Sequence, residues 1–447
     1  MTQFIGVDIG TTGTKVACYD STHRRLVALR RARSSEVADA WGGARDPVLV
    51  VTEVNRLLRE LLRDDAVQAR HISGIAVCSV GEEVVLLDDG HRPVGTVLCW
   101  HARHGAAALQ QAPARRLTAP VGGVDPTVSL YKLAWLAMHR PEDMRRASCW
   151  TGLADFVALS LLGPGAEHVF LNASHASRTG LLDIVRGCLD PAPLQELRVS
   201  GPALPTLLPS GRPVGRTSAH GVLPQGVTVV TGGHDHFCGA FGAGVRSPGE
   251  AYVSAGTSEA QMILVEEPPT VVPGGIGVGV FVAGPLHYLF RATPSGRLFG
   301  RWREMLYPGV SDETLWREVD AARGEVVGAS IEVATGTYAL SDLPFEASRG
   351  HVMAALTAGL AGEADRTTAL LEELASARVE SVTVAGVPTR SRTWRRIRQQ
   401  ATARTLRFVA EPEATVLGVA LLAQQGVTGG ADRPTTFLSE ASATANP

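Results

Sequence analysis

The sequence predicts an α/β protein made of two domains. Its 447 residues, 45% of them hydrophobic, are enough for two packed cores at about 150 residues per domain. Residues 4–80 read as strand, hairpin, strand, helix and strand, the order of a mixed sheet covered by helices. The same theme restarts near residue 226. We therefore expect domains at residues 1–243 and 244–447.

The opening elements follow from their hydrophobic patterns. Residues 4–10 and 15–20 alternate apolar with small or polar side chains, and the sequence TTGT joins them as a hairpin turn. Residues 24–33 fit a third strand. Residues 46–65 predict a helix, because an aspartate can cap its start, a proline follows, and valines and leucines form one apolar face. Residues 72–80 are expected to form a buried strand.

The later elements repeat this plan. Further helices are expected at residues 129–140 and 153–163. Near residue 226 the theme restarts, and residues 226–244 predict a buried strand, a glycine-rich turn and a helix of small residues. A second Gly-Thr hairpin follows at residues 250–265. Near the C-terminus the pattern predicts two strands, a helix that Ser391 can cap, and a final helix of small residues.

Composition excludes several classes of function. The formal net charge of −2 and the 5% of aromatic residues leave no basic-aromatic stripe for nucleic acid and no field favouring an anionic membrane. The six scattered cysteines include no C-x-x-C pair, so we expect reduced thiols, and we expect no leader segment. We therefore expect a cytoplasmic protein with a small-molecule substrate and no nucleic-acid or membrane partner. A homodimer remains open.

The two predicted hairpin turns concentrate small, hydroxylated and charged residues. Such a turn directs several backbone N–H groups to one place, glycine allows close approach, and hydroxyls add donors, which suits phosphate oxygens. Lys15, one of only two lysines, can neutralise a terminal phosphate, and Asp8 can hold Mg²⁺ or its waters. Two facing turns could clamp a nucleotide polyphosphate between the domains. The plain alternative is an ordinary hairpin turn.

A third feature is the sequence TGGHDHFCGAFGAG, which follows a predicted strand. Asp235 lies in its glycine-rich turn, where catalytic groups are commonly displayed. Phosphoryl transfer to an alcohol needs a carboxylate that accepts or orients the hydroxyl proton, and Asp235 fits that role. The flanking His234 and His236 could instead form a metal site, although no third ligand cluster is evident. We favour His236 as a polar contact to substrate.

In their order along the chain, five segments resemble the FGGY carbohydrate kinases, a family that includes xylulokinase, gluconokinase and glycerol kinase. They are VDIGTTGTK, SLYKLAWL, GGHDHFCGAFGAG, SAGTSEA and EPEATVLGVALLA, and the resemblance covers residues 4–426. It implies two actin-like, ribonuclease-H-like ATPase domains around an interdomain cleft. It also implies ATP and Mg²⁺, with transfer of the γ-phosphoryl group to a hydroxyl of a sugar or polyol.

The resemblance also implies roles for individual residues. Asp8 matches the magnesium-associated aspartate, Asp235 the catalytic base and His236 its substrate-side neighbour. Glu82 lies where glycerol kinases carry a substrate-binding glutamate, and Trp100 matches a tryptophan of the substrate cleft. For Glu82 the alternative is a solvated acidic pair with Glu83, and for Trp100 it is core packing. The residues that match the two phosphate loops and the adenosine loop are Gly10, Thr11, Thr12, Thr14, Lys15, Gly256, Thr257, Gly386 and Arg390.

The sequence departs from the family at two places. Ala102 stands where the family usually has an aspartate after Trp100. Val387 and Pro388 follow Gly386 where further glycines are usual, and proline fixes φ and removes an N–H, so backbone approach to the adenosine must differ. These departures bear on the acceptor and on the nucleotide preference.

Together these observations predict an ATP-dependent kinase for a ketose or related polyol, with Asp235 as base and Mg²⁺ assisting. Three alternatives remain open. The first is a weak or inactive ATP- or sugar-binding sensor on the same fold. The second is a kinase for a non-sugar polyol or cyclitol. The third is an actin- or Hsp70-like ATPase that acts on protein partners.

Overall fold

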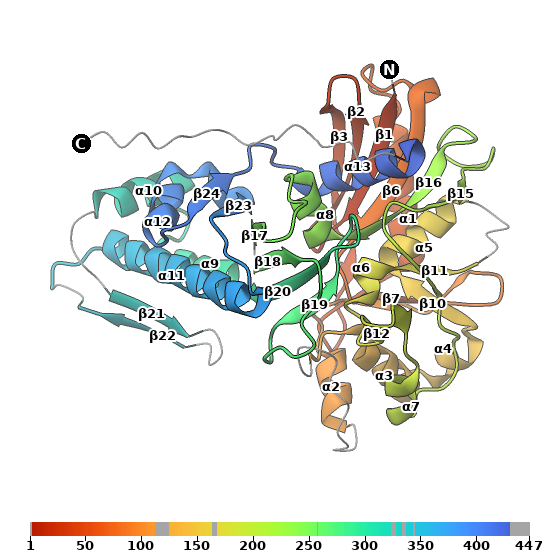
Figure 1. Cartoon of the computed structure of the whole chain (residues 1–447), viewed down its shortest axis with the longest axis horizontal. Helices are drawn as coiled ribbons and strands as arrows, with labels where there is room; N and C mark the ends of the chain where they lie inside the picture. The colour runs from red at the N-terminus through yellow and green to blue at the C-terminus, as the bar shows by residue number, and fades with distance from the viewer. Residues whose placement is uncertain are drawn as a thin grey trace.

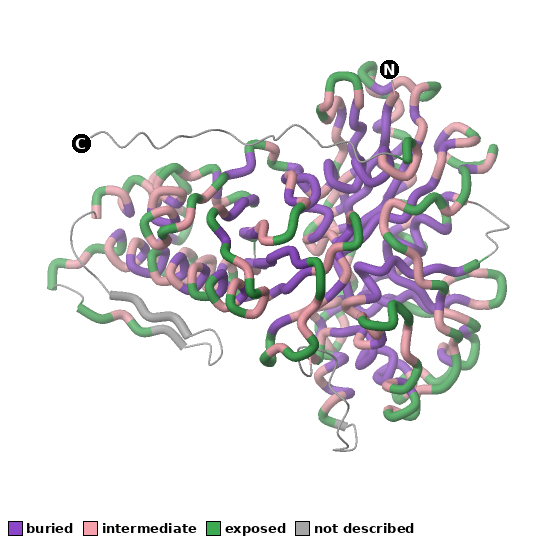
Figure 2. Tube along the Cα trace, in the orientation of Figure 1, coloured by how far each residue is buried: buried purple, intermediate pink, exposed green. Residues whose placement is uncertain are grey.

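A computed structural model describes residues 2–111, 125–162, 168–256, 258–322, 328–332, 337–342 and 345–429. Two six-stranded sheets dominate it, and Figure 2 shows that the buried residues gather along them. In the described residues no helix combines the length and the apolar character needed to span a bilayer.

The first sheet confirms the predicted opening hairpin. Its antiparallel strands β1, β2 and β3 are followed on the other side of β1 by the parallel strands β6 and β16, and β15 closes that edge. Mixed pairing of this kind is expected where a hairpin opens an α/β unit. The bounds are β1 (Gln3–Ile9), β2 (Gly13–Asp20), β3 (Arg25–Arg33), β6 (Ile72–Ser79), β15 (Pro213–Arg216) and β16 (Thr228–His234).

The second sheet repeats the plan of the first. The hairpin β17–β18 pairs with β20 on one side, and β23 and β24 run parallel to β17 on the other. β19 adds an edge strand beyond β20. The bounds are β17 (Ala251–Ala255), β18 (Glu259–Val265), β19 (Gly277–Val280), β20 (His287–Thr293), β23 (Ser381–Ala385) and β24 (Thr405–Phe408). The repeat of sheet topology therefore begins at β17, and the restart predicted near residue 226 was placed too early, because β16 (Thr228–His234) pairs with β6 in the first sheet.

Helices cover both faces of the first sheet. α1 (Pro47–Leu61) and α5 (Leu153–Leu162) pack on one face, and α8 (Asp235–Gly242) and α13 (Ala414–Thr428) lie on the other. The predicted cap of α1 is confirmed, because the Asp46 side chain accepts from the second and third backbone N–H groups of the helix. At Gly6 in β1, a Cβ would lie 2.3 Å from the Val416 carbonyl oxygen, so only glycine lets α13 approach this closely.

The long helix α11 (Arg349–Ala375) packs on the second sheet, beside α9 (Ser295–Leu306), α10 (Asp312–Ala321) and α12 (Arg392–Gln400). Ser391 caps α12, as predicted, by accepting from the Trp394 N–H. Figure 1 shows α13 beside β1 and β6, apart from these helices. The boundary near residue 244 stays a prediction, and α13 contacts the first sheet although it follows that boundary.

Insertions between β6 and β16 build a third core below the first sheet. Segment 172–180 of this region contacts the second half as well, because the Val280 N–H donates to Ser177 Oγ. The other helices are α2 (His104–Gln111), α3 (Ser129–His139), α4 (Pro141–Arg146), α6 (Ala173–Ala176) and α7 (Ala192–Glu196). The shorter strands are β4 (Glu36–Val37), β5 (Ala44–Arg45), β7 (Val84–Leu87), β8 (Pro93–Val94), β9 (Val97–Leu98), β10 (Cys149–Gly152), β11 (Phe170–Asn172), β12 (Leu182–Asp183), β13 (Cys188–Leu189), β14 (Thr206–Leu208), β21 (Gly328–Glu332) and β22 (Thr337–Ser341).

Candidate active site

Asp8 and Asp235 come together at one edge of the first sheet. Asp8 in β1 lies opposite Cys78 in β6, and Cys78 lies opposite Gly233 in β16, two residues before Asp235. The parallel strands thus bring Asp8 and the start of α8, where Asp235 lies, to the same end of the first sheet. Burial, and next the charge of Asp235, raise the pKa of Asp8 to about 7. The sequence placed these two carboxylates 227 positions apart, and the fold makes them neighbours.

Asp235 is held by groups of its own segment. Its Oδ1 accepts from the His236 backbone N–H at 2.7 Å and lies 2.8 Å from His234 Nδ1. Burial acts to raise the pKa of Asp235, but His236 and His234 outweigh it and hold that pKa below the usual aspartate range. Asp235 is therefore an ionised acceptor at neutral pH, positioned at the first residue of α8.

The histidines beside Asp235 have no third metal ligand close to them in the part of the chain that the structure describes. The rings of His234 and His236 stack, with centroids 5.5 Å apart, and His236 is also 5.9 Å from the Phe290 ring. Burial, opposed by Asp235, lowers the pKa of His236. Among the described residues, one group of three possible ligands has its ligand atoms within 4.8 Å of each other. It consists of Glu36, Cys99 and His101, and it includes neither His234 nor His236.

The turn of the first hairpin is tied to its surroundings. The Gly10 N–H donates to the Gly13 carbonyl at 2.9 Å, and Arg45 Nη1 donates to the Gly10 carbonyl at 3.2 Å. Trp100 Nε1 donates to Thr11 Oγ1 at 2.9 Å, so the half-buried Trp100 contacts the turn directly. Thr12 is exposed at the tip, whereas Thr14 is buried in β2.

Lys15 follows this turn and faces the end of α13. Lys15 is opposite Asp8 in the hairpin register, and its ammonium lies 2.7 Å from the Glu413 carboxylate. Arg31 Nη2 approaches the same carboxylate at 3.5 Å. The Lys15 side chain remains one-third exposed, so its charge is only partly compensated. Glu413 lay within a motif of the sequence, but nothing in the sequence showed that it pairs with Lys15.

The structure overturns one interpretation of Glu82 and Glu83. Both are buried, at 8% and 3% exposure, so they are not a solvated acidic pair. Glu82 accepts from Arg178 Nε at 2.6 Å, and Glu83 lies 3.2 Å from Arg45 Nε. Burial, opposed by Arg45, raises the pKa of Glu83 to about 7. Arg178 escaped the sequence analysis, because one arginine among 42 basic residues carries no signal of its own.

The predicted second loop lies at the turn of β17 and β18. Gly256 N–H donates to the Ser258 carbonyl at 3.0 Å, and Thr257 lies outside the described residues. Gly386 has a φ of 118°, and a Cβ there would lie 1.9 Å from the Ala255 carbonyl oxygen. Glycine is therefore required where the chain leaves β23 and passes the end of β17.

After Gly386 the chain forms a short 3₁₀ turn over Val387–Arg390, in which Pro388 takes an early position where its missing N–H costs nothing. The Arg390 side chain is exposed. The turn therefore leaves Arg390 beside the edge of the second sheet with its charge in solvent.

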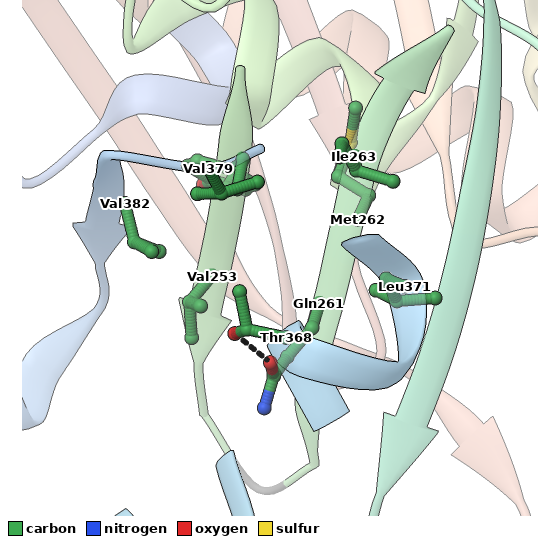
Figure 3. Close-up of a pocket in the computed structure, with 10 residues that line it drawn as sticks. Val253, Gln261, Met262, Ile263, Thr368, Leu371, Val379 and Val382 are labelled. Carbon is green, nitrogen blue, oxygen red and sulfur yellow. Dashed lines mark hydrogen bonds between the residues drawn. The ribbon is translucent and has the colours of Figure 1, made fainter. Parts of the chain in front are cut away.

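A small void elsewhere in the second half is part of the core. Figure 3 shows it between β17, β18 and the helix α11, lined mostly by apolar side chains such as Val253, Ile263 and Leu371. Thr368 donates to Gln261 Oε1 across it at 3.1 Å. None of the predicted site residues lines this void, so it is separate from the candidate active site.

Comparison with known proteins agrees with this geometry. A model of the FGGY family of carbohydrate kinases, N-terminal domain, matches residues 3–242. The L-fuculokinase of Salmonella typhi is 24% identical over 94% of this chain and 92% of the relative. The autoinducer-2 kinase of Salmonella choleraesuis (strain SC-B67) is 29% identical over 48% of this chain and 41% of the relative.

Among solved structures, the ligand-bound xylulose kinase of Lactobacillus acidophilus has a TM-score of 0.86 at 18% identity, covering 98% of this chain and 92% of that one. The fold is thus the two-domain, actin-like ATPase fold that the sequence predicted. The chain belongs to the FGGY family of carbohydrate kinases, and it is a carbohydrate kinase.

Proposed function

We propose that this kinase transfers the γ-phosphoryl group of ATP to a hydroxyl of a ketose or related polyol, with Asp235 as the base. The observation that carries the proposal is that Asp8 and Asp235 approach each other at one end of the first sheet, beside the strand β2 that carries Lys15. A hydroxyl acceptor, a cation and a phosphate chain need these groups within one site.

Asp235 accepts the proton of the acceptor hydroxyl. The hydroxyl oxygen forms a bond to the γ-phosphorus, the bond from that phosphorus to the β,γ-bridging oxygen breaks, and ADP leaves. In a loose transition state the hydroxyl proton is lost late, so an ionised carboxylate of low pKa serves mainly to orient the hydroxyl. His234 and the His236 N–H fix that carboxylate in place.

Asp8 is the residue that suits a magnesium ion. Its carboxylate is buried, has the weak Cys78 thiol donor at 3.8 Å, and carries a raised pKa that a nearby cation would relieve. The Asp8 carboxylate would supply an oxygen ligand of the kind that Mg²⁺ prefers. When bound, the ion neutralises charge on the phosphate oxygens. Glu413 adds a third carboxylate that influences Asp8.

The hairpin residues bind and orient the phosphates in this proposal. Gly10, Thr11 and Thr12 form the turn, and Thr14 and Lys15 follow it in β2. Lys15 exchanges part of its contact with Glu413 for a phosphate oxygen. Gly256 and Thr257 approach the phosphates from the second hairpin, and Gly386 and Arg390 flank the adenosine. This division of roles follows from the repeated sheet plan, in which each half presents one hairpin turn.

The acceptor is proposed to be a neutral ketose or related polyol. Two similar proteins are named L-fuculokinase and xylulose kinase, and both names point to a ketose as acceptor. Glu82, Trp100 and His236 provide hydroxyl acceptors, an aromatic surface and a polar ring next to Asp235. A homodimer stays a prediction.

A coupled ADP-release screen tests the proposal. The protein is supplied with Mg·ATP and a panel of ketoses, aldoses, sugar acids, polyols and cyclitols that includes L-fuculose and xylulose, with Asp235→Ala as the blank. We expect one acceptor class to release ADP only with intact Asp235. Equal ADP release with and without every acceptor, or in the two proteins, would contradict the proposal.

A further inference from the structure

A buried ion cluster around Arg178 adjoins the proposed site, and of its members only Glu82 has a role in the proposed function. Arg178 Nε donates to Glu82 Oε1 at 2.6 Å, and Nη2 donates to Asp125 Oδ2 at 2.8 Å. Only 13% of the Arg178 side chain is exposed. Burial opposes its charge, but Glu82 and Asp125 raise the pKa of Arg178, so the guanidinium is permanently cationic.

The cluster lies next to Asp235. At Gly81, the residue before Glu82, a Cβ would lie 2.5 Å from His234 Nε2 and 3.6 Å from Arg178 Cβ. The backbone at Gly81 therefore runs between the histidine that holds Asp235 and the arginine. Phe290 of the second sheet spans the same region, because its ring is 5.9 Å from both the Arg178 Cζ and the His236 ring.

Two polar atoms of the pair are left for a ligand. Within the described part of the chain, Arg178 Nη1 and Glu82 Oε2 make no hydrogen bond, although their neighbours Nε, Nη2 and Oε1 do. The two side chains keep a small exposed fraction, 13% for Arg178 and 7% for Glu82. Gly277 of β19 lies close to Nη1, because a Cβ there would be only 3.3 Å from that atom.

Glu82 is also strained in a way that stability alone does not explain. Its φ is 64°, a left-handed conformation that glutamate seldom adopts. Strain of this kind persists where the surrounding structure fixes a side chain for a purpose. A buried ion pair, moreover, is weak evidence for added stability, because desolvation offsets much of the attraction. Both arguments favour a binding role for the pair.

We propose that Glu82 and Arg178 form a donor–acceptor pair that binds two neighbouring oxygens of the acceptor, which makes Arg178 a specificity-determining residue. This inference rests on the proposed function and deepens it. Arg178 Nη1 donates to one oxygen, and Glu82 Oε2 accepts from the hydroxyl next to it. A vicinal diol or a hydroxyketone offers this arrangement.

The charges of the cluster select neutral acceptors. Arg178 already faces two carboxylates, Glu82 and Asp125, and the buried Lys132 lies nearby with a pKa that burial lowers to about 8. A sugar acid would bring a further negative charge toward Glu82. Arg178 would attract that charge only weakly, because Glu82 and Asp125 already neutralise the guanidinium. The acceptor is therefore a neutral polyhydroxy compound and not a sugar acid.

Arg178→Lys tests the pair, because lysine keeps the charge and loses the planar fork. The substrate is whichever neutral member of the ADP-release panel is turned over fastest, and each of its deoxy analogues is measured too. We expect the acceptor KM to rise about 10- to 100-fold, the loss typical of a hydrogen bond to a charged group, with the KM for ATP unchanged. Arg398→Lys is the matched control, since Arg398 is also buried, at 6% exposure of its side chain, and is bonded to Glu259 in the other half.

The deoxy analogues separate contact from indirect damage. If Arg178 binds an oxygen of the acceptor, one deoxy analogue weakens binding to the native protein and causes little further loss in Arg178→Lys. Additive losses for every analogue, or an unchanged acceptor KM, would overturn the pair. Glu82→Gln, which keeps the shape of the side chain, gives a second route should Arg178→Lys unfold, and thermal unfolding monitors both proteins.

Calorimetric titration of the same sugars distinguishes failure of this inference from failure of the proposed function. Sugar binding that needs Arg178 but leads to no phosphoryl transfer would keep the pair and reject the kinase scheme for these sugars. Transfer that Arg178→Lys leaves unaltered would reject the pair and keep the scheme. If native protein binds no neutral member of the panel, or prefers sugar acids, the inference is wrong.

Discussion

The two hairpins share a backbone plan but differ in how their charges are compensated. In the first, Asp8 lies opposite Lys15, whose partner Glu413 leaves it one-third exposed. In the second, the buried Glu259 accepts from both terminal nitrogens of Arg398, at 2.9 and 3.0 Å. The charge beside the first turn is thus partly exposed to solvent, whereas the charge beside the second is buried and fully paired.

This difference separates chemistry from structure within one repeated fold. A charge that must meet a substrate cannot be fully paired inside the protein, whereas a structural charge must be, because an unpaired buried charge is costly. We infer that the first half supplies the charged groups for phosphoryl transfer. The second half then contacts the nucleotide mainly through its backbone turn.

The largest effect is expected at Asp235, the proposed base beside the first hairpin. Asp235→Asn removes the proton acceptor and keeps the shape, so kcat should fall by about 10³-fold or more. The affinity for ATP, measured by calorimetry, should change little, because Asp235 contacts the acceptor. A kcat within tenfold of the native value would remove Asp235 from the mechanism.

The second hairpin should respond in stability and not in catalysis. Arg398→Met leaves Glu259 buried without its partner, so the free energy of unfolding should fall by about 3–5 kcal/mol. Denaturant unfolding measures this loss. A Glu259→Gln change in the same protein should recover part of it, since the unpaired charge is gone. Loss of acceptor-dependent kcat in a fully folded Arg398→Met protein would contradict the claim that the Arg398–Glu259 pair is purely structural.

Lys15 should show the opposite behaviour. Lys15→Met removes a point charge from the phosphate site, and kcat should fall about 10²-fold. The free energy of unfolding should change by less than about 1 kcal/mol, because the pair with Glu413 is partly exposed. Arg31→Met is the matched control, since Arg31 contacts the same carboxylate from outside the turn. Equal losses of kcat in the two variants would sink the assignment of Lys15.

The smallest expected effect is a pH dependence of stability from Asp8. Its pKa rises from 3.8 to about 7 on folding, so the folded protein binds the extra proton between these values. The free energy of unfolding therefore falls as pH rises through that window, and Asp8→Asn removes the fall. Without Mg²⁺, the free energy of unfolding of the native protein should fall by about 2 kcal/mol from pH 5 to pH 7 relative to that of Asp8→Asn.

Asp88→Asn is the control for this measurement. The pKa of Asp88 lies below its usual value, held there by Arg92, so its proton is lost below this window. Denaturant unfolding at the two pH values should show no change for Asp88→Asn. The same gain in both variants would show that the titrating group is not Asp8.

The parts of the molecule that follow from neighbouring residues were predictable. The first hairpin and the capped helices α1 and α12 each depend on a few adjacent side chains. The glycine-rich turn expected at Asp235 was wrong, because Gly232 and Gly233 lie in β16 and Asp235 is the first residue of α8. The compensation of charge was not predictable. Arg178 pairs with Glu82 across 96 positions, and Arg31 with Glu413 across 382. Burial was equally hidden, since nothing in the sequence distinguishes a buried acidic pair such as Glu82 and Glu83 from a solvated one.

A ³¹P NMR time course with Mg·ATP and the fastest neutral acceptor tests the central claim most directly. The account predicts a new phosphate-monoester resonance that grows in step with ADP and is lost in Asp235→Asn. A rise of inorganic phosphate and ADP without that resonance would contradict it. That result would identify an ATPase that does not use the acceptor.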